Sequence, residues 1–127
     1  MKYCPCGTQK RYLECCGAYL EDKALPPTPE TLMRSRYTAF VEKKADYLNK
    51  TMTIPPFEKK AIEKGKGEWL GLEVIQAYPH STNSNIGYVE FIAKHTQPNN
   101  KVATIHELSE FHFIVDRWYY VSGIQKF

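Results

Sequence analysis

The sequence contains no apolar run that approaches the roughly 18 residues needed for a membrane-spanning helix. Its first residues lead directly into a polar, cysteine-rich segment, without the apolar stretch of a secretory signal peptide. From these two absences we expect a cytoplasmic protein without a membrane span. In that compartment, disulfide bonds are rare.

A large excess of charge of either sign is also absent. The 17 basic and 14 acidic residues give a net charge of +3, too small to indicate a nucleic-acid partner. The phosphate-binding P-loop, the G-x-G-x-x-G loop, the serine-hydrolase G-x-S-x-G motif and the metalloprotease H-E-x-x-H motif are all missing. These absences exclude the enzyme classes that such motifs define.

Cysteine is missing from everything after residue 16. The four cysteines are Cys4, Cys6, Cys15 and Cys16, whereas a disulfide framework would spread its cysteines over the core. The whole chain has 127 residues, of which 43% are hydrophobic and 13% aromatic, enough for one ordinary domain core. The cysteines therefore form a local feature at one end of a single-domain chain.

The spacing of the cysteines favours a structural zinc site. Four thiolates within thirteen residues can surround one ion if the chain folds back, and Pro5 and Gly7 provide a stiff pair followed by a sharp turn. With all four donors supplied by protein, no coordination position remains for a catalytic water. The alternatives are two disulfides, a redox role for low-pKa thiols, or four thiols without a role.

The segment 4–17, CPCGTQKRYLECCG, resembles the SEC-C motif, the zinc-binding knuckle at the C-terminus of the SecA translocation ATPase. The resemblance implies that the metal ligands are Cys4, Cys6, Cys15 and Cys16. Thr8 and Gln9 replace the usual serine and glycine, and neither position is a ligand. We call residues 1–20 the knuckle. The Pro26-Pro27 pair separates it from residues 28–127, so we expect a second unit that folds without it.

The remaining chain predicts helices followed by strands, which is an α+β order. Thr28 as N-cap and Pro29 at the first helical position begin a helix that the apolar spacing extends to about residue 44. Shorter helices are predicted near 46–48 and over 57–64. The period then changes to two, which predicts strands over 69–78, 86–95, 102–115 and 118–122, with a tight turn at 116–117.

Several segments together resemble the YchJ-like family of small bacterial proteins, whose biochemical function is unassigned. They are 32–40 (LMRSRYTAF), 46–48 (DYL) with Thr51, 69–72 (WLGL), 89–91 (VEF), 107–111 (ELSEF) and 118–123 (WYYVSG). The resemblance implies a cone-shaped fold like that of nuclear transport factor 2 (NTF2). In that fold, N-terminal helices pack in the concave face of a curved antiparallel sheet.

Glu107 and Ser109 interrupt the apolar face of the predicted strand 102–115. A carboxylate on a buried face needs a partner or a raised pKa. Three interpretations stay open: a structural ion pair with Arg34 or Arg36, a polar pocket for a small ligand, or a catalytic carboxylate. The candidate pocket residues are Arg34, Arg36, Tyr37, Tyr47, Trp69, Glu107, Ser109 and Tyr120.

Three functions follow from these features. The first is a binding or adaptor module that docks through its zinc knuckle on a protein or a ribosome-associated partner, as the resemblance to the SecA tail implies. The second is a cone-fold enzyme or small-molecule binder that uses the pocket around Glu107. The third is a thiol-redox role. The four-thiolate spacing favours the first over the third, and the sequence identifies no catalytic residue.

Overall fold

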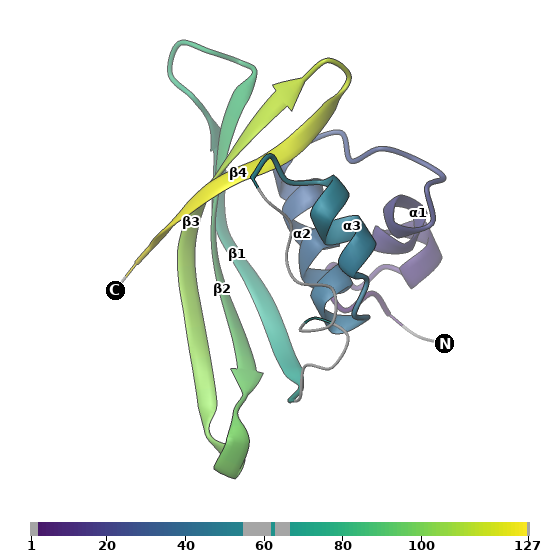
Figure 1. Ribbon diagram of the computed structural model, residues 1–127, viewed down its shortest axis with the longest axis vertical. Coiled ribbons are helices and arrows are strands. Elements are labelled where there is room, and N and C mark those ends of the chain that lie inside the picture. Colours follow the sequence, from purple (N-terminus) through teal and green to yellow (C-terminus); the bar gives the residue numbers. More distant parts are fainter. Residues whose placement is uncertain (1–2, 55–61, 63–66, 127) are drawn as a thin grey trace.

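In the computed structural model, residues 3–54, 62 and 67–126 are described. Short helices lie on one side of a long twisted sheet (Figure 1). The elements are the 3-10 helix η1 (Tyr12–Glu14), helices α1 (Cys16–Leu20), α2 (Pro29–Val41) and α3 (Ala45–Lys50), strands β1 (Trp69–Pro79) and β2 (Ile86–Thr96), the 3-10 helix η2 (Pro98–Asn100), and strands β3 (Val102–Ile114) and β4 (Arg117–Gln125). The predicted α+β architecture, with helices in the concave face of a curved antiparallel sheet, is confirmed.

The four strands form an antiparallel meander in the order β1-β2-β3-β4. The β2–β3 register runs without interruption from Ile86 opposite His112 to Thr96 opposite Val102. Irregularities interrupt β1 between Trp69 and Gly71 and between Val74 and Gln76. Because a bulge bends its strand and increases the local twist, these positions help to curve the sheet around the helices.

Helix α2 begins where the sequence predicts. Thr28 is its N-cap: the hydroxyl of Thr28 accepts a hydrogen bond from the backbone N–H of Thr31, and the Thr31 hydroxyl accepts one from the Thr28 N–H. Pro29 occupies the first helical position, where its missing N–H costs nothing. This capping fixes the residue at which α2 begins, and therefore which of its side chains face the sheet.

Helix α2 lies at the centre of the molecule, with the sheet on one side and α1 and α3 on others (Figure 1). This arrangement explains why buried side chains occupy most of its circumference, namely Leu32, Met33, Ser35, Arg36, Tyr37, Thr38 and Ala39. The polar members of this set each have a partner, as buried polar groups require. For example, the Ser35 hydroxyl donates to the Leu32 carbonyl and lies 2.6 Å from the Tyr47 hydroxyl.

Several boundaries differ from the sequence prediction. Helix α2 ends at Val41 and not near residue 44. The last hairpin turns at Val115 and Asp116, one residue earlier than predicted, with Val115 at a φ of 62°. Strand β4 continues to Gln125, beyond the predicted end at residue 122. The helix predicted over 57–64 lies, except for Ile62, outside the described residues.

No helix in the described parts of the chain has the length and apolar character needed to cross a bilayer.

The knuckle shares a hydrophobic core with the sheet. Cys4, Cys6 and Cys16 are 4%, 0% and 1% exposed, and they belong to one buried cluster with Leu32, Met33, Tyr37, Val89, Phe91, Ala93 and Phe111. Removing the knuckle would expose this side of α2 to water. The packing therefore argues against the expectation that residues 28–127 fold well alone.

Candidate functional site

The four cysteines converge into one compact cluster of sulfur atoms. All four Sγ atoms lie within 4.8 Å of one another. The Sγ atoms of Cys6 and Cys15 are 3.6 Å apart, and those of Cys15 and Cys16 are 4.0 Å apart. Four sulfurs at about 2.3 Å from a tetrahedral ion would be about 3.8 Å apart. The spacing thus fits a single metal ion, and the four cysteines could hold one.

Side chains and backbone groups around the cluster position the sulfurs. The Thr8 hydroxyl lies 3.2 Å from Cys15 Sγ, and the hydroxyl of Thr38, in α2, lies 3.7 Å from Cys4 Sγ. Arg34, also in α2, donates through Nη1 to the Cys6 carbonyl at 2.7 Å. The hydroxyls of Thr8 and Thr38 can donate hydrogen bonds to thiolates, as the groups around a metal-bound sulfur usually do.

The electrostatics of the cluster also favour a cation. Hydrogen bonds from Cys16 and Cys6 lower the pKa of Cys4. The reciprocal interactions with Cys4 and Cys6, together with burial, raise the pKa of Cys16. Neighbouring thiolates repel one another, so the four thiols cannot all ionise easily without a bound cation. A bound divalent cation would remove this conflict by stabilising every thiolate at once.

A cavity of about 230 Å³ lies between α2 and the concave face of the sheet. Most of its wall is apolar, and four polar side chains, Arg36, Glu107, Ser109 and Tyr120, come from α2, β3 and β4. The complete lining is Met33, Arg36, Tyr37, Phe40, Trp69, Phe91, Ala93, Ile105, Glu107, Ser109 and Tyr120. An apolar cavity with a few converging polar groups is the usual form of a small-molecule site.

Glu107 is half-buried at the wall of this cavity. Its Oε1 accepts hydrogen bonds from the Ser109 hydroxyl at 2.8 Å and the Tyr120 hydroxyl at 3.1 Å. Within the described part of the chain, Glu107 forms no ion pair with Arg34 or Arg36, so the structural ion pair considered above is not formed. One oxygen of the carboxylate instead accepts from two hydroxyls, and of these the Tyr120 hydroxyl could not be predicted from the alternation along one strand.

Arg36 packs over the face of the Tyr120 ring. Its Cζ is 4.7 Å from the ring centroid, and its Nη1 donates to the Leu48 carbonyl and the Thr51 hydroxyl at 2.8 and 2.7 Å. Burial lowers the pKa of Arg36 to about 10, so it remains a cation at neutral pH. Burial and the charge of Glu107 raise the pKa of Tyr120 to about 12, which keeps its phenol protonated as a donor.

The structure brings six of the eight candidate pocket residues together at the cavity: Arg36, Tyr37, Trp69, Glu107, Ser109 and Tyr120. The other two lie elsewhere. Arg34 faces the knuckle and forms an ion pair with Glu30 at 3.0 Å. Tyr47 packs on the α3 side of α2, where its hydroxyl meets Ser35.

Gly123 is a further residue of this site that the sequence reasoning left without a role. It pairs with Ser109 across the β3–β4 ladder, and a Cβ built on it would lie 1.8 Å from Glu107 Oε1. The missing side chain of Gly123 therefore leaves the space in which the Glu107 carboxylate lies. In the sequence, Gly123 directly follows the predicted strand 118–122, whereas β4 continues through it to Gln125. A glycine within a strand often marks a close approach of another group.

Replacing Gly123 by alanine is expected to displace the Glu107 carboxylate and break its hydrogen bonds to Ser109 and Tyr120. We expect a loss of about 1 kcal/mol in the free energy of unfolding, measured by chemical denaturation. The control is the same substitution in a Glu107→Ala background, where there is no carboxylate to displace. Equal losses in both backgrounds would contradict this role for Gly123.

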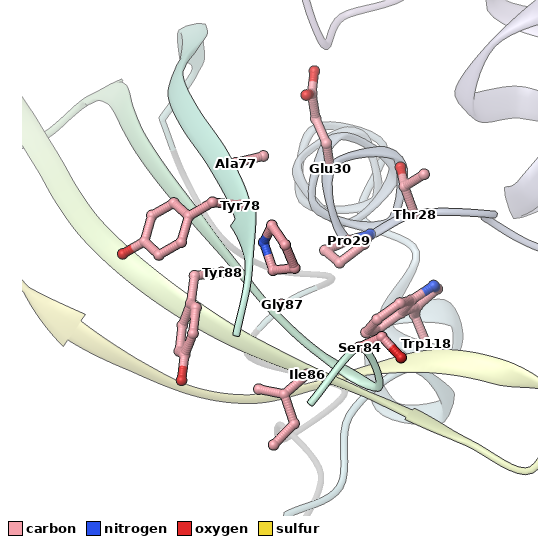
Figure 2. Close-up of a pocket in the computed structure, with 11 residues that line it drawn as sticks. Thr28, Pro29, Glu30, Ala77, Tyr78, Ser84, Ile86, Gly87, Tyr88 and Trp118 are labelled. Carbon is pink, nitrogen blue, oxygen red and sulfur yellow. The ribbon is translucent and has the colours of Figure 1, made fainter. Parts of the chain in front are cut away.

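A second hollow, of about 310 Å³, lies where the start of α2 meets the β1–β2 hairpin (Figure 2). Pro29 packs against Gly87 there, and the Trp118 indole N–H donates to the Pro27 carbonyl at 3.2 Å. Figure 2 shows the Glu30 carboxylate pointing away from the other lining side chains. The lining of this second hollow lacks the converging charged groups that surround Glu107. The cavity under α2 is therefore the stronger candidate for a binding site.

Together, the fold and the cysteines define a class of protein: a small NTF2-like α+β domain joined to a four-cysteine knuckle. The family described as "YchJ, middle NTF2-like domain" matches residues 28–123. The chain belongs to this YchJ-like family.

Relatives and solved structures agree with this assignment. A UPF0225 protein of Yersinia pestis (strain Pestoides F) is 40% identical, over 96% of this chain and 82% of its own length. A SEC-C motif protein of Rhodopseudomonas palustris matches with a TM-score of 0.84 and 32% identity, covering 99% of this chain and 100% of that one. A SEC-C motif protein of Psychrobacter arcticus matches with a TM-score of 0.81 and 30% identity, and the match covers 100% of this chain and 84% of that one. The predicted family and motif are thus confirmed.

Proposed function

We propose that this protein binds a small molecule in the cavity around Glu107, in a domain whose N-terminal end is held by a structural zinc ion. The observation that carries the proposal is the convergence of Arg36, Glu107, Ser109 and Tyr120 at one cavity. A buried arginine beside a half-buried carboxylate, without a direct ion pair between them, sacrifices stability, which is typical of a functional site.

The chemistry of the knuckle supports zinc as the metal. Zinc favours tetrahedral sets of four thiolates, and such closed sets have structural roles because they leave no position for water. Burial of Cys4, Cys6 and Cys16 in the common core supports the same role, since the ion would tie the knuckle to α2.

The test of the cavity uses Trp69, which lines it, as the reporter. In a Trp118→Phe background, a library of small aromatic compounds should include members that change the Trp69 fluorescence. The Ala93→Leu variant should abolish these changes, because Ala93 is 2% exposed and faces the same cavity. Ala103→Leu, outside the lining, is the control. Changes that persist unaltered in Ala93→Leu would place the ligands elsewhere and refute the proposal.

Docking on a protein or ribosome-associated partner is the second candidate function. The observation that favours it is the exposure of two large side chains on the knuckle, Tyr3 at 65% and Leu13 at 60%. Leu13 borders a hollow of about 530 Å³ lined by Arg11, Tyr12, Leu13, Glu14, Glu42 and Lys44. An apolar side chain within a charged rim is a common arrangement at protein interfaces.

Docking through this surface predicts that Leu13→Asp will abolish partner capture by the immobilised protein. A charge at the centre of an apolar contact must be desolvated without a partner, and we expect at least a tenfold loss of affinity. Val115→Asp is the matched control, because Val115 is 94% exposed at the β3–β4 turn, away from the knuckle. Identical capture by both variants would contradict docking through the knuckle.

A further inference from the structure

We propose that the ligand of the Glu107 cavity is a flat, uncharged molecule with an amide-type edge, in which an N–H lies beside a C=O. This inference rests on the proposed small-molecule function and names the chemical class of the ligand. It follows from the hydrogen-bonding capacity that Arg36 and Glu107 have left, and from the shape of the apolar wall.

Arg36 lines the cavity and has N–H donors that no described residue uses. Its side chain belongs to a residue only 4% exposed, and the hydrogen bonds to Leu48 and Thr51 both leave from Nη1. To the described residues, Nε and Nη2 donate no hydrogen bond. A guanidinium has five N–H donors and no acceptor, so Arg36 is suited to a ligand oxygen.

Glu107 lines the same cavity and has an acceptor oxygen that no described residue uses. Both of its hydrogen bonds, from Ser109 and Tyr120, end on Oε1. Among the described residues, no group donates to Oε2. An ionised carboxylate only accepts, so this oxygen is suited to a ligand N–H.

The two charges make a charged ligand head unfavourable. Arg36 and Glu107 both contact Tyr120, with the guanidinium over the face of its ring and the carboxylate at its hydroxyl. An anionic head would be repelled by the Glu107 carboxylate, and a cationic head would be repelled by the Arg36 guanidinium. An amide edge offers its C=O to Arg36 and its N–H to Glu107 without adding charge.

The remainder of the wall suits an aromatic ring. Tyr37 and Phe40 on α2 pack against Trp69, with ring centroids 5.6 and 5.8 Å from that of Trp69, and Phe91 lines the sheet side. Aromatic side chains favour offset or edge-to-face contacts with a flat ligand. A ligand with one aromatic ring or two fused rings that carry the amide edge therefore matches both the aromatic wall and the polar groups of the cavity.

Three probes that share a naphthalene ring and differ in the charge of the head group test the inference: 2-naphthamide, 2-naphthoate and 2-naphthylmethylammonium. Each is titrated into the zinc-loaded chain of residues 1–127 while backbone and Trp69 indole N–H shifts are followed by NMR. We expect the amide to bind at least tenfold more tightly than either charged probe, and its shifts to disappear in Ala93→Leu. If a charged probe binds as tightly as the amide, the amide inference is wrong while the cavity proposal stands. If no probe shifts Trp69, both are overturned.

Glu107→Gln supplies a second, independent measurement. Glutamine keeps the size of the side chain and an acceptor for Ser109 and Tyr120, but it removes the charge and offers N–H donors. The variant should therefore bind 2-naphthoate at least fivefold more tightly than the parent protein, and its preference for the amide should fall below threefold. Unchanged selectivity in a variant whose melting temperature matches the parent would overturn the assignment of Glu107.

Discussion

Replacing Cys6 by serine should remove the metal and lower the free energy of unfolding by at least about 4 kcal/mol, a large part of the roughly 5–15 kcal/mol of a domain this size. Cys6 is 0% exposed and belongs to the core cluster that includes Leu32 and Phe111. The substitution removes one metal ligand and also places a hydroxyl in that core. Because metal binding and folding are coupled, the remaining thiols would not restore the site.

The measurements are elemental analysis of the purified protein and chemical denaturation with and without a chelator. We expect about one zinc per chain in the parent protein and none in Cys6→Ser. Leu13→Ser, at a 60% exposed position of the same knuckle, should change stability by no more than about 0.5 kcal/mol. A parent protein without metal, combined with an unchanged midpoint in Cys6→Ser, would refute the zinc centre.

The second large effect is expected at Arg36. Arg36→Met keeps the length of the side chain but removes the hydrogen bonds to Leu48 and Thr51, and the cation that opposes Glu107. Charge-assisted hydrogen bonds to buried groups contribute strongly, so we expect a loss of about 3 kcal/mol in the free energy of unfolding.

The Arg36 result can be separated from a general effect of losing positive charge. Arg11→Met removes the same charge from an exposed position of the knuckle and should cost less than about 0.5 kcal/mol. Combining Arg36→Met with Glu107→Gln should cost less than the sum of the single variants, because the lone carboxylate is removed as well. Simple additivity would show that the two charges do not interact.

Much of the fold could be predicted from local signals. Thr28 and Pro29 mark the start of α2 because a capping hydroxyl and a fixed φ act over only a few residues. The long alternation from residue 102 predicts β3 because it also depends only on residues that are neighbours in the sequence. The predicted β3–β4 turn lies one residue late because Val115, a β-branched residue, adopts a positive φ, which sequence preference disfavours.

The candidate site was less accessible from the sequence. Alternation places Glu107 and Ser109 on one face, but the contact with Tyr120 depends on the register and bulge between β3 and β4. The prediction that Arg34 lies at the cavity is wrong, because Glu30, Arg34 and Thr38 follow one another at intervals of four along α2. That spacing puts them on one helix face, which turns out to be the face toward the knuckle.

Helix α2 connects the two sites of the molecule. One of its faces positions the cysteines through Arg34 and Thr38, while another contributes Arg36 and Tyr37 to the cavity. If filling the cavity fixes the rotation of this helix, it also fixes the surroundings of the sulfurs. Thermodynamic linkage then requires reciprocity: the factor by which the ligand strengthens metal binding equals the factor by which the metal strengthens ligand binding. The concentration of available metal would then determine what fraction of the protein molecules binds the ligand.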